Sequence, residues 1–317
     1  MQLSGGNLTI QTGVGTPTTI NVLSFSDSGE LIAAGKDFGR VVLWNTQPQR
    51  FLRAIETDQG IVSAVALSPD GKTLATGGDQ DESSVKLWDV ASGKLIKRLD
   101  LGGGNIAWLE INHSGRWMVV KHNGGSLAVV EIDTGKPVLT LQDGLAARFS
   151  ADGTTLIEED KKEFGIWDTA NWQKKATLPR PEGSPLLLAV NAGADRVAVL
   201  QRSGIRVLRL STGETISGLA DVLPKTKTGM VRAVTLNADG SVLYASIDDH
   251  LWVWDTRSNE ICVSPVMYSS GGALSGDGRW LAGSKDDSIL SSERTDGVWV
   301  WDTAHLTSGC GIAAPAK

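Results

Sequence analysis

The sequence predicts an all-β protein built from seven copies of one four-stranded antiparallel unit. A turn motif with the pattern apolar, small polar, any residue, Asp or Ser, Gly recurs at intervals of 42, 44, 38, 41, 46 and 38 residues. A second motif, which in five of seven copies contains Trp, follows each turn. This period suits four short strands, and repetition explains how 317 residues can exceed the usual size of one domain.

The turn motif predicts the hairpin between the first two strands of each repeat, a and b. Asp-Gly and Ser-Gly pairs tolerate the positive φ that such tight turns demand. VNAGA is a divergent copy, since Ala stands where the other copies have Gly. The turns are FSDSG ending at Gly29, LSPDG at Gly71, INHSG at Gly115, FSADG at Gly153, VNAGA at Ala194, LNADG at Gly240 and LSGDG at Gly278.

The second motif predicts the third strand, c. Its copies are VLWN at Trp44, KLWD at Trp88, VVEI at Val130, GIWD at Trp167, VLRL at Leu208, WVWD at Trp254 and WVWD at Trp301. A four-stranded sheet with two apolar faces must stack on its neighbours, and an indole between sheets buries a large apolar area. We therefore expect a structural role for Trp44, Trp88, Trp167, Trp254 and Trp301.

Both motifs resemble those of the WD-repeat family over essentially the whole chain. The resemblance implies a seven-bladed β-propeller that forms a single domain over residues 1–317, with the repeats at about 18–305. The last repeat stops at HLTSGCGIAAPAK without a fourth strand. Residues 7–11, NLTIQ, form a short alternating strand that we expect to complete the seventh blade and so remove an open sheet edge. Residues 306–317 are expected to be a short tail, and no segment predicts a helix.

The chain departs from the family pattern at its histidines. The Gly-His pair that the family places before strand a is absent, because His113, His122, His250 and His305 all lie elsewhere. The family's His–Asp–Trp hydrogen-bond network therefore cannot form as usual. Aspartates remain near the b–c turns, and we expect them to be partly exposed or to bind Ser, Thr or backbone N–H donors, because unpaired buried carboxylates are costly. They are Asp37, Asp79, Asp160, Asp248 and Asp286.

Three insertions suggest a binding surface, because loops that grow often carry partners. They are DQDESS at 79–84, DDSILSSERTD at 286–296 and LADVLPKTKTG before the sixth repeat. The resemblance implies that b–c loops and d–a connections share one face, the top. The insertions would then form an arc over blades 6, 7, 1 and 2, unless they are loop-length variation without function. The candidate partner-binding residues are Asp81, Glu82, Lys225, Lys227, Trp252, Glu293, Arg294 and Trp299.

Trp252 and Trp299 each precede a strand-c Trp by two positions, so each shares a strand face with that residue. Two indoles at the top rim would flank the central opening, and Trp is enriched at interface hot spots. Packing between blades is the alternative interpretation.

The search for chemistry is negative. The sequence has no H-E-x-x-H, C-x-x-C, G-x-S-x-G or P-loop motif, so we expect no enzyme, catalytic residue, metal or cofactor. The formal charge of −6 favours neither nucleic-acid nor membrane partners. Cys262 and Cys310 are too few for a disulfide framework, which favours two idle thiols and a cytoplasmic location, although a single bridge is compatible with the sequence.

Three function classes stay open. The first is a protein-binding scaffold, recruitment or sensor module, monomeric when isolated and either free-standing or part of a longer polypeptide or complex. SPDGKTLATGG and VKLWDVASGK resemble bacterial propellers, which often serve in this way beside an effector. The second is an architectural subunit of a fixed complex. The third is a propeller enzyme with a site in the central channel, for which no set of ligands can be identified.

Overall fold

A computed structural model defines the architecture of the chain. It describes residues 8–11, 20–79, 84–102, 104–123, 125–180, 186–201, 204–218, 231–247, 250–267, 270–285 and 297–309. These ranges contain strands β1 to β28 and one helix, α1. The chain divides into two units. The four-blade unit comprises Gly6–Thr140 and Tyr268–Asp302, and the three-blade unit comprises Met1–Gly5, Leu141–Met267 and Thr303–Lys317.

The four-blade unit contains blades 1, 2, 3 and 7. Blade 1 consists of β2 (Ile20–Phe25), β3 (Leu31–Lys36), β4 (Arg40–Thr46) and β5 (Gln49–Glu56). Blade 2 consists of β6 (Val62–Leu67), β7 (Thr73–Gly78), β8 (Ser84–Asp89) and β9 (Leu95–Asp100). Blade 3 consists of β10 (Ile106–Ile111), β11 (Trp117–His122), β12 (Leu127–Glu131) and β13 (Pro137–Leu141). Blade 7 consists of β26 (Ser270–Leu274), β27 (Trp280–Lys285), β28 (Gly297–Asp302) and β1 (Leu8–Gln11).

The three-blade unit contains blades 4, 5 and 6. Blade 4 consists of β14 (Ala146–Phe149), β15 (Thr155–Glu159), β16 (Glu163–Asp168) and β17 (Lys174–Pro179). Blade 5 consists of β18 (Leu186–Val190), β19 (Arg196–Gln201), β20 (Gly204–Arg209) and β21 (Thr215–Gly218). Blade 6 consists of β22 (Val231–Leu236), β23 (Val242–Ile247), β24 (His250–Asp255) and β25 (Ile261–Met267). Helix α1 (Thr303–Gly309) is also in this unit.

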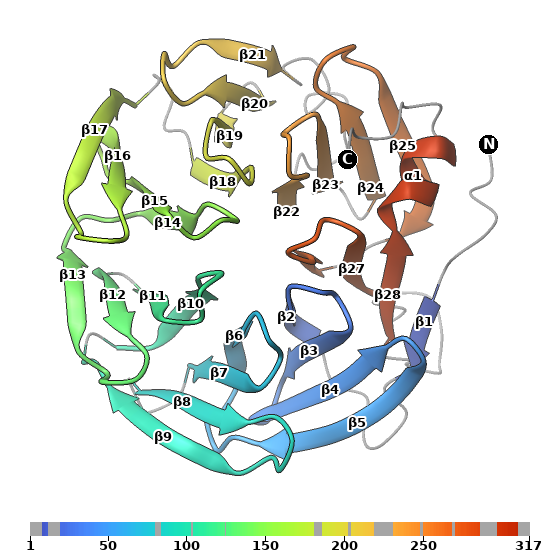
Figure 1. Cartoon of the computed structure of the whole chain (residues 1–317). Coiled ribbons are helices and arrows are strands. Elements are labelled where there is room, and N and C mark those ends of the chain that lie inside the picture. Colours follow the sequence, from blue (N-terminus) through green and yellow to red (C-terminus); the bar gives the residue numbers. More distant parts are fainter. Residues whose placement is uncertain are drawn as a thin grey trace. The chain divides into compact units, whose positions relative to one another are not determined.

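Every blade is a four-stranded sheet, and blades 1 to 6 keep their strands in sequence order from a to d. In the four-blade unit, β2 lies beside β26. β2 also lies beside β6, and β6 lies beside β10 (Figure 1). In the three-blade unit, β18 lies beside both β14 and β22. The predicted fold class is therefore confirmed: all-β, with seven propeller blades of four antiparallel strands.

The fourth strand of blade 7 comes from the opposite end of the sequence. β1 pairs with β28 in the order β1-β28-β27-β26, with Leu8 opposite Val300 and Gln11 opposite Gly297. The prediction that residues 7–11 complete the last blade is confirmed, with the strand beginning at Leu8. This pairing gives β28 a neighbour on both sides.

The a–b turns use the left-handed backbone conformation that their glycines predict. The six turn glycines have φ between 67° and 72°. Ala194, in the divergent turn motif of blade 5, adopts the same conformation with φ of 52°. A side chain at positive φ is unfavourable, so blade 5 keeps its turn geometry without the residue that best allows it.

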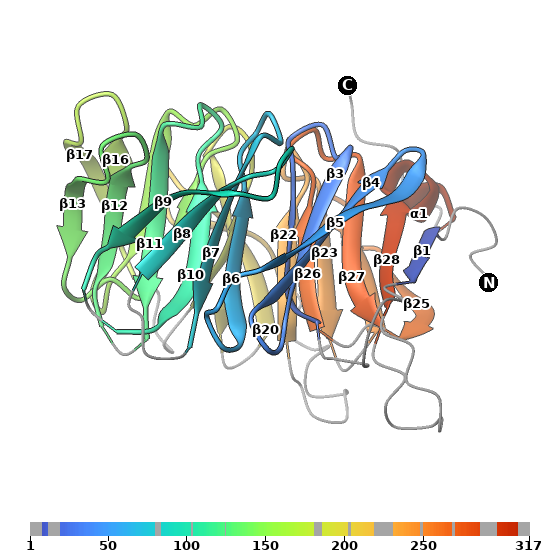
Figure 2. The same ribbon diagram turned by 90° about the horizontal axis from the view of Figure 1, so that it is seen from below.

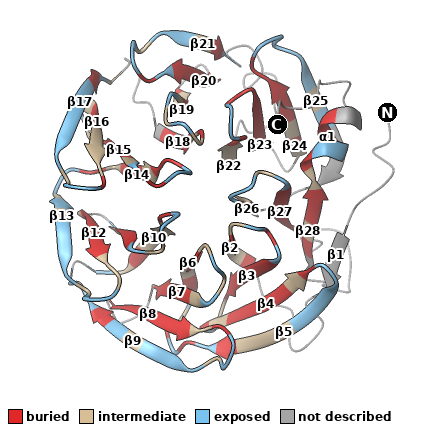
Figure 3. Cartoon of the chain, viewed as in Figure 1, coloured by how far each residue is buried: buried red, intermediate tan, exposed pale blue. Residues whose placement is uncertain are grey.

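The core lies mainly on strands a, b and c, while the outer d strands β9 and β13 are mostly exposed (Figure 3). Four of the strand-c indoles are buried: Trp44, Trp88, Trp254 and Trp301. Trp167 is only half-buried, and the Lys174 ammonium covers its ring at 5.1 Å from the centroid. Strand-c tryptophans thus belong to the packing of the blades, although one of them keeps an exposed side.

The end of the described chain differs from the prediction. Residues Thr303–Gly309 form helix α1, where the sequence indicated no helix and a tail from 306. Leu306 is buried, and the Thr307 hydroxyl donates to the carbonyl of Thr303 at 3.0 Å. The helix spans only seven residues, too few to show a helical period in the sequence.

The cysteines also differ from the prediction. Cys262 in β25 is disulfide-bonded, so the expectation of idle thiols is wrong for this residue. Cys310 lies outside the described residues. Sequence separation says nothing about the distance between two cysteines in a folded chain, which is why the spacing could not decide the matter. Within the described ranges, no helix is long and apolar enough to cross a membrane.

Candidate interaction surface

We call the b–c turns and the adjoining d–a connections the b–c edge. The resemblance to WD-repeat proteins places these segments on the top face. The strands run between this edge and the a–b edge (Figure 2). The blade 1–2 junction, residues 37–39 and 57–61, is the part of this edge that joins blade 1 to blade 2. The Gly39 carbonyl accepts hydrogen bonds from the Thr57 N–H at 2.6 Å and the Thr57 hydroxyl at 2.8 Å. A Cβ at Gly39, where φ is 71°, would lie 3.2 Å from the Gln59 backbone nitrogen, so the two segments are in backbone contact.

A buried polar network lies below this junction. The Trp88 indole N–H donates to the Thr76 hydroxyl at 2.9 Å, and that hydroxyl donates to Gln59 Oε1 at 2.5 Å. The Gln59 amide donates in turn to the carbonyl of Ser84 at 3.0 Å. Blade 2 therefore forms a Trp–Thr–Gln network without histidine, with the Gln59 amide supplying both a donor and an acceptor.

Three further hydrogen bonds fix the connection between the blades. The buried Lys86 ammonium donates to the Thr57 carbonyl at 2.7 Å. The Ile61 N–H donates to Asp79 Oδ1 at 2.8 Å, and the Asp79 N–H donates back to the Ile61 carbonyl at 3.2 Å. Hydrogen bonds thus hold both ends of the connection, and these bonds within the chain define its conformation.

The junction exposes apolar side chains. Phe38 is 82% exposed and has φ of 61°, and Ile61 is 40% exposed. Phe38 and Gly39 both have positive φ, as the central residues of a type I′ hairpin turn do, and that turn ordinarily favours Asn-Gly. A bulky side chain in this conformation is unusual.

Similar backbone contacts recur at other blades. In blade 3 the N–H of Asn123, after strand b, donates to the carbonyl of Asn105 at 2.8 Å. In blade 4 the N–H of Arg180, after strand d, donates to the carbonyl of Lys162 in the b–c turn at 3.0 Å. Turns and connections of the b–c edge are therefore tied to one another in both units.

The three b–c aspartates within the described residues are partly exposed and hydrogen-bonded, as predicted, although the donor to Asp37 is an Asn amide and not a Ser, Thr or backbone group. Half-buried Asp37 accepts from the Asn21 amide at 3.0 Å. Half-buried Asp160 accepts from the backbone N–H groups of Lys162 at 2.6 Å and Glu163 at 2.8 Å. The remaining members of the set are Asp79, described above, and Asp248 and Asp286, which lie outside the described residues.

The two candidate tryptophans both have packing contacts. Trp252 is half-buried, donates from its indole to the Ile247 carbonyl at 3.3 Å, and packs against the apolar cluster of blades 5 and 6. Trp299 is half-buried and stacks on Trp301, with ring centroids 6.3 Å apart and planes inclined by 10°. These contacts are of the kind that the packing interpretation expects, and a role in binding stays a prediction. The two residues belong to different units.

The other candidate partner-binding residues lie on the inserted loops. None of them is within the described residues: Asp81, Glu82, Lys225, Lys227, Glu293 and Arg294. Their assignment to a binding surface stays a prediction.

Blade 4 has two buried carboxylates where blade 2 has neutral residues. Glu159 is fully buried and accepts from the Arg180 guanidinium at 2.7 Å and from the Leu187 N–H at 2.5 Å. Burial raises the pKa of Glu159, against the opposing effect of these two donors. Burial also raises the pKa of Glu158, although its hydrogen bond from the Trp167 indole favours the ionised form. Perturbed carboxyl groups are candidates for acid–base chemistry, but these two bind structural partners between strands.

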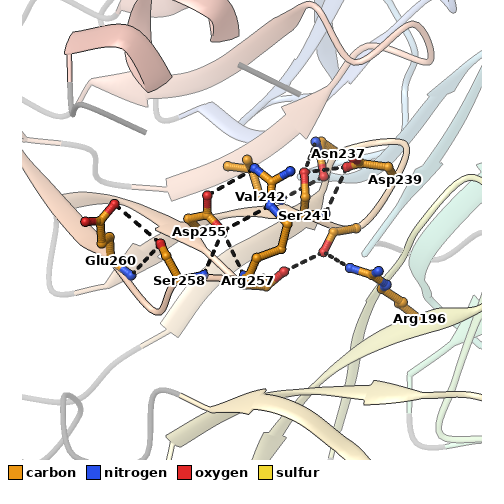
Figure 4. Close-up of polar contacts among 11 residues, drawn as sticks. Arg196, Asn237, Asp239, Ser241, Val242, Asp255, Arg257, Ser258 and Glu260 are labelled. Atoms are coloured by element: carbon orange, nitrogen blue, oxygen red, sulfur yellow. Dashed lines mark hydrogen bonds and ion pairs between the residues drawn. The ribbon is translucent and has the colours of Figure 1, made fainter. Parts of the chain in front are cut away.

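A polar network at the a–b edge of blade 6 is also structural (Figure 4). Asp255 caps the turn after strand c by accepting the N–H of Arg257 at 2.7 Å and that of Ser258 at 3.2 Å. Burial is the largest single influence on the pKa of Asp239 and raises it, but the hydrogen bonds from Ser241 and Asn237 and the charge of Arg257 oppose it, and the net effect lowers that pKa. The contacts of this network stabilise turns, and each one drawn in Figure 4 joins two groups of the protein itself.

One ion pair joins turns at the a–b edge of the four-blade unit. His113 Nδ1 contacts the Asp27 carboxylate, and the backbone carbonyl of Asp27 accepts the N–H of Asp277 at 2.9 Å. Burial raises the pKa of Asp27, while His113 opposes that shift. In the described part of the chain, no three His, Cys, Asp or Glu side chains are grouped so that they could hold a metal ion.

Two residues of the blade 1–2 junction were not singled out from the sequence. Gln59 occupies the d–a connection, and its role depends on contacts with Thr76 and Ser84, which are remote in sequence. Phe38 had a local signal, because Asp-Phe-Gly stands where an Asn-Gly turn is favoured.

The comparisons with known proteins agree with the repeat architecture. A family model described as the anaphase-promoting complex subunit 4 WD40 domain matches residues 23–110, a range that includes the Gln59 network. Residues 23–110 are therefore similar to a WD40 domain. Only this part of the chain is covered by the match.

Several curated proteins are similar in sequence to this chain. It is 25% identical to autophagy-related protein 16 of Arabidopsis thaliana, over 73% of this chain and 45% of that protein. It is 22% identical to a periodic tryptophan protein 2 homolog of Schizosaccharomyces pombe, over 80% of this chain and 30% of that protein. A shorter match, 37% identical, joins 22% of the chain to 20% of small ribosomal subunit protein RACK1y of Oryza sativa subsp. japonica. The chain thus spans less than half the length of each of these eukaryotic relatives.

Proposed function

We propose that this WD40-repeat chain is a non-catalytic module that binds other proteins through the loops of its b–c edge. The observation that carries the proposal is the mutual bonding of b–c turns and d–a connections, as between Gly39 and Thr57. A surface whose loops are already ordered loses little conformational entropy when a partner binds. The exposed Phe38 and Ile61 side chains supply apolar contact area on that surface.

The names of the matched proteins are consistent with this role. The family model is that of a subunit of a complex, one relative is a protein of the small ribosomal subunit, and another is called retinoblastoma-binding-like. What these proteins bind is a property of theirs. For this chain, the partner would be a protein, with the top-face loops of blades 6, 7, 1 and 2 as the contact surface.

Two other functions make different predictions. An architectural subunit of a fixed complex should self-associate or aggregate when isolated, whereas a recruitment module should elute as a monomer in size-exclusion chromatography. An enzyme would need reactive groups that converge on a substrate, and the perturbed carboxyl groups described above bind structural partners instead. No comparison supports the resemblance to bacterial propellers. A cytoplasmic location stays a prediction, and the disulfide at Cys262 argues against it, because disulfides persist mainly in oxidising compartments.

Affinity capture tests the proposal. The intact chain is used as bait in an extract of the source cells, beside a variant that lacks residues 287–296 and a control variant, Ile96→Ser, changed on the outer strand β9. The loop deletion should remove partners that the intact chain and the control retain. Identical partner sets for all three baits would contradict the use of this loop, and specific capture of no protein would contradict the binding function.

A further inference from the structure

The blade 1–2 junction carries a side chain that the turn does not need. Phe38 occupies the first central position of a type I′ turn, where Asn is preferred and an aromatic residue at positive φ is strained. With 82% of its surface exposed, the ring adds little to the core. Strain that stability does not explain is a recognised sign of a functional position.

The backbone that presents Phe38 is fixed independently of its ring. Gly39 bonds to Thr57 through backbone and hydroxyl groups, and Lys86 and Gln59 hold the facing connection from below. An apolar side chain on a fixed turn is the type of anchor from which binding hot spots are built, because its position requires no ordering on association.

The exposed charges around Phe38 are acidic. Asp58 is exposed and has φ of 54°, Asp37 precedes Phe38 directly, and Asp79 bonds to the connection. Glu56 is exposed and pairs with Arg40 at 3.4 Å. The two lysines of this region, Lys36 and Lys86, are buried, and the half-buried Arg40 is paired with Glu56, so carboxylates outnumber cations on the described surface that a partner would meet.

We propose that the blade 1–2 junction docks a peptide segment that carries a large apolar side chain flanked by Lys or Arg. The apolar side chain would pack on Phe38 and Ile61, and the flanking cations would face Asp58 and Asp79, since complementary charge around an apolar centre gives specificity and speeds association. The proposal rests on the proposed protein-binding function and names its partner by chemistry.

The probe is a phage-displayed library of random twelve-residue peptides, selected on the immobilised full chain. The most enriched peptide is then synthesised with a fluorescein label and titrated by anisotropy. We expect enriched peptides to carry Leu, Ile, Phe or Trp between basic residues. Enrichment of acidic or uncharged peptides, or of none, would overturn the proposal.

Two variants locate the binding site. Phe38→Asn introduces the residue type that the turn favours, so the variant should fold at least as well as the parent. It should nevertheless bind the peptide at least about 10-fold more weakly. Asp58→Asn removes one charge at a position of positive φ, a conformation that Asn adopts readily. The variant should bind the peptide several-fold more weakly, and its binding should depend less on salt. The control, Phe51→Ser, removes an exposed ring from β5 outside the junction and should bind as the parent does.

The outcomes separate this proposal from the protein-binding function. If selected peptides bind equally to the parent and to Phe38→Asn, the docking site is wrong while a binding function elsewhere holds. If no peptide is selected but the affinity capture still yields partners, the chain binds folded proteins and the peptide-docking proposal is wrong.

Discussion

Blades 2 and 4 use the same framework position in opposite ways. In blade 2 the strand-c indole of Trp88 bonds to the hydroxyl of Thr76, and the network continues through neutral Gln59. In blade 4 the indole of Trp167 bonds to the carboxylate of Glu158. The strand-c indole N–H therefore has an acceptor in both blades, neutral in one and a carboxylate in the other.

The difference has a consequence for stability. The neutral network of blade 2 changes no protonation state near neutral pH. Glu158 and Glu159 have raised pKa values in the folded state, so the folded protein takes up protons before the unfolded chain does. Their ionisation lowers the free energy of unfolding as pH rises through the interval between the ordinary Glu pKa and the raised one.

The largest expected effect comes from removing the cation of blade 4. Arg180→Met leaves the buried Glu159 carboxylate without its guanidinium and should lower the free energy of unfolding by about 3 to 5 kcal/mol at pH 7. The loss should shrink at pH 5, because the raised pKa lets the folded state protonate Glu159. Urea unfolding followed by tryptophan fluorescence measures both values. Arg98→Met, at an exposed site, is the control, and an equal loss at both pH values would contradict the charge argument.

A smaller effect is expected in blade 2. Gln59→Leu removes the amide and leaves the Ser84 carbonyl buried without that donor, which should cost about 2 kcal/mol. Because no ionisable group is changed, the loss measured by urea unfolding should be the same at pH 5 and pH 7. Gln49→Leu, at an exposed position of β5, should have little effect. A clear pH dependence of the Gln59→Leu loss would break the comparison between the blades.

Neutralising the acceptor of blade 4 sharpens the comparison. Glu158→Gln keeps an oxygen for the Trp167 indole and removes the cost of burying charge, while Lys174 keeps its partner Glu163 at 2.9 Å. The free energy of unfolding at pH 7 should rise by about 1 kcal/mol. Between pH 7 and pH 5 the variant should gain less stability than the parent, and an unchanged pH profile in urea unfolding would show that Glu158 is already protonated.

The smallest effect lies outside both networks. Ala194→Gly relieves the strain of a side chain at positive φ in the blade 5 turn, which should raise the free energy of unfolding by about 0.5 to 1 kcal/mol. The greater conformational entropy of glycine in the unfolded chain offsets part of this gain. Thermal unfolding should show the same shift at pH 5 and pH 7. A destabilised variant would mean that the left-handed alanine costs less than the added freedom.

The sequence predicted the fold because the fold is written in local, repeated signals. Gly29 and its equivalents marked each a–b turn, Trp88 and its equivalents marked strand c, and NLTIQ supplied the strand missing from the last repeat. Helix α1 is too short to show a period and was missed.

The candidate site was less predictable, because its contacts join residues that are remote in sequence. Gln59 reaches Thr76 and Ser84 across strands, and Glu159 meets Arg180 only after the chain has passed through strands c and d. The inserted loops were found by their length, which says nothing of their contacts. Phe38 could have been found from its turn type, since Asp-Phe-Gly replaces a favoured Asn-Gly pair.

The pairing of β1 with β28 also constrains how the protein is made. Leu8 leaves the ribosome long before its partner Val300, because all seven repeats are synthesised between them. Blade 7 therefore cannot close until its own strands have been made, and contacts between segments so remote in sequence form slowly. Until then, the nascent chain carries an unpaired strand that chaperones or neighbouring chains could bind.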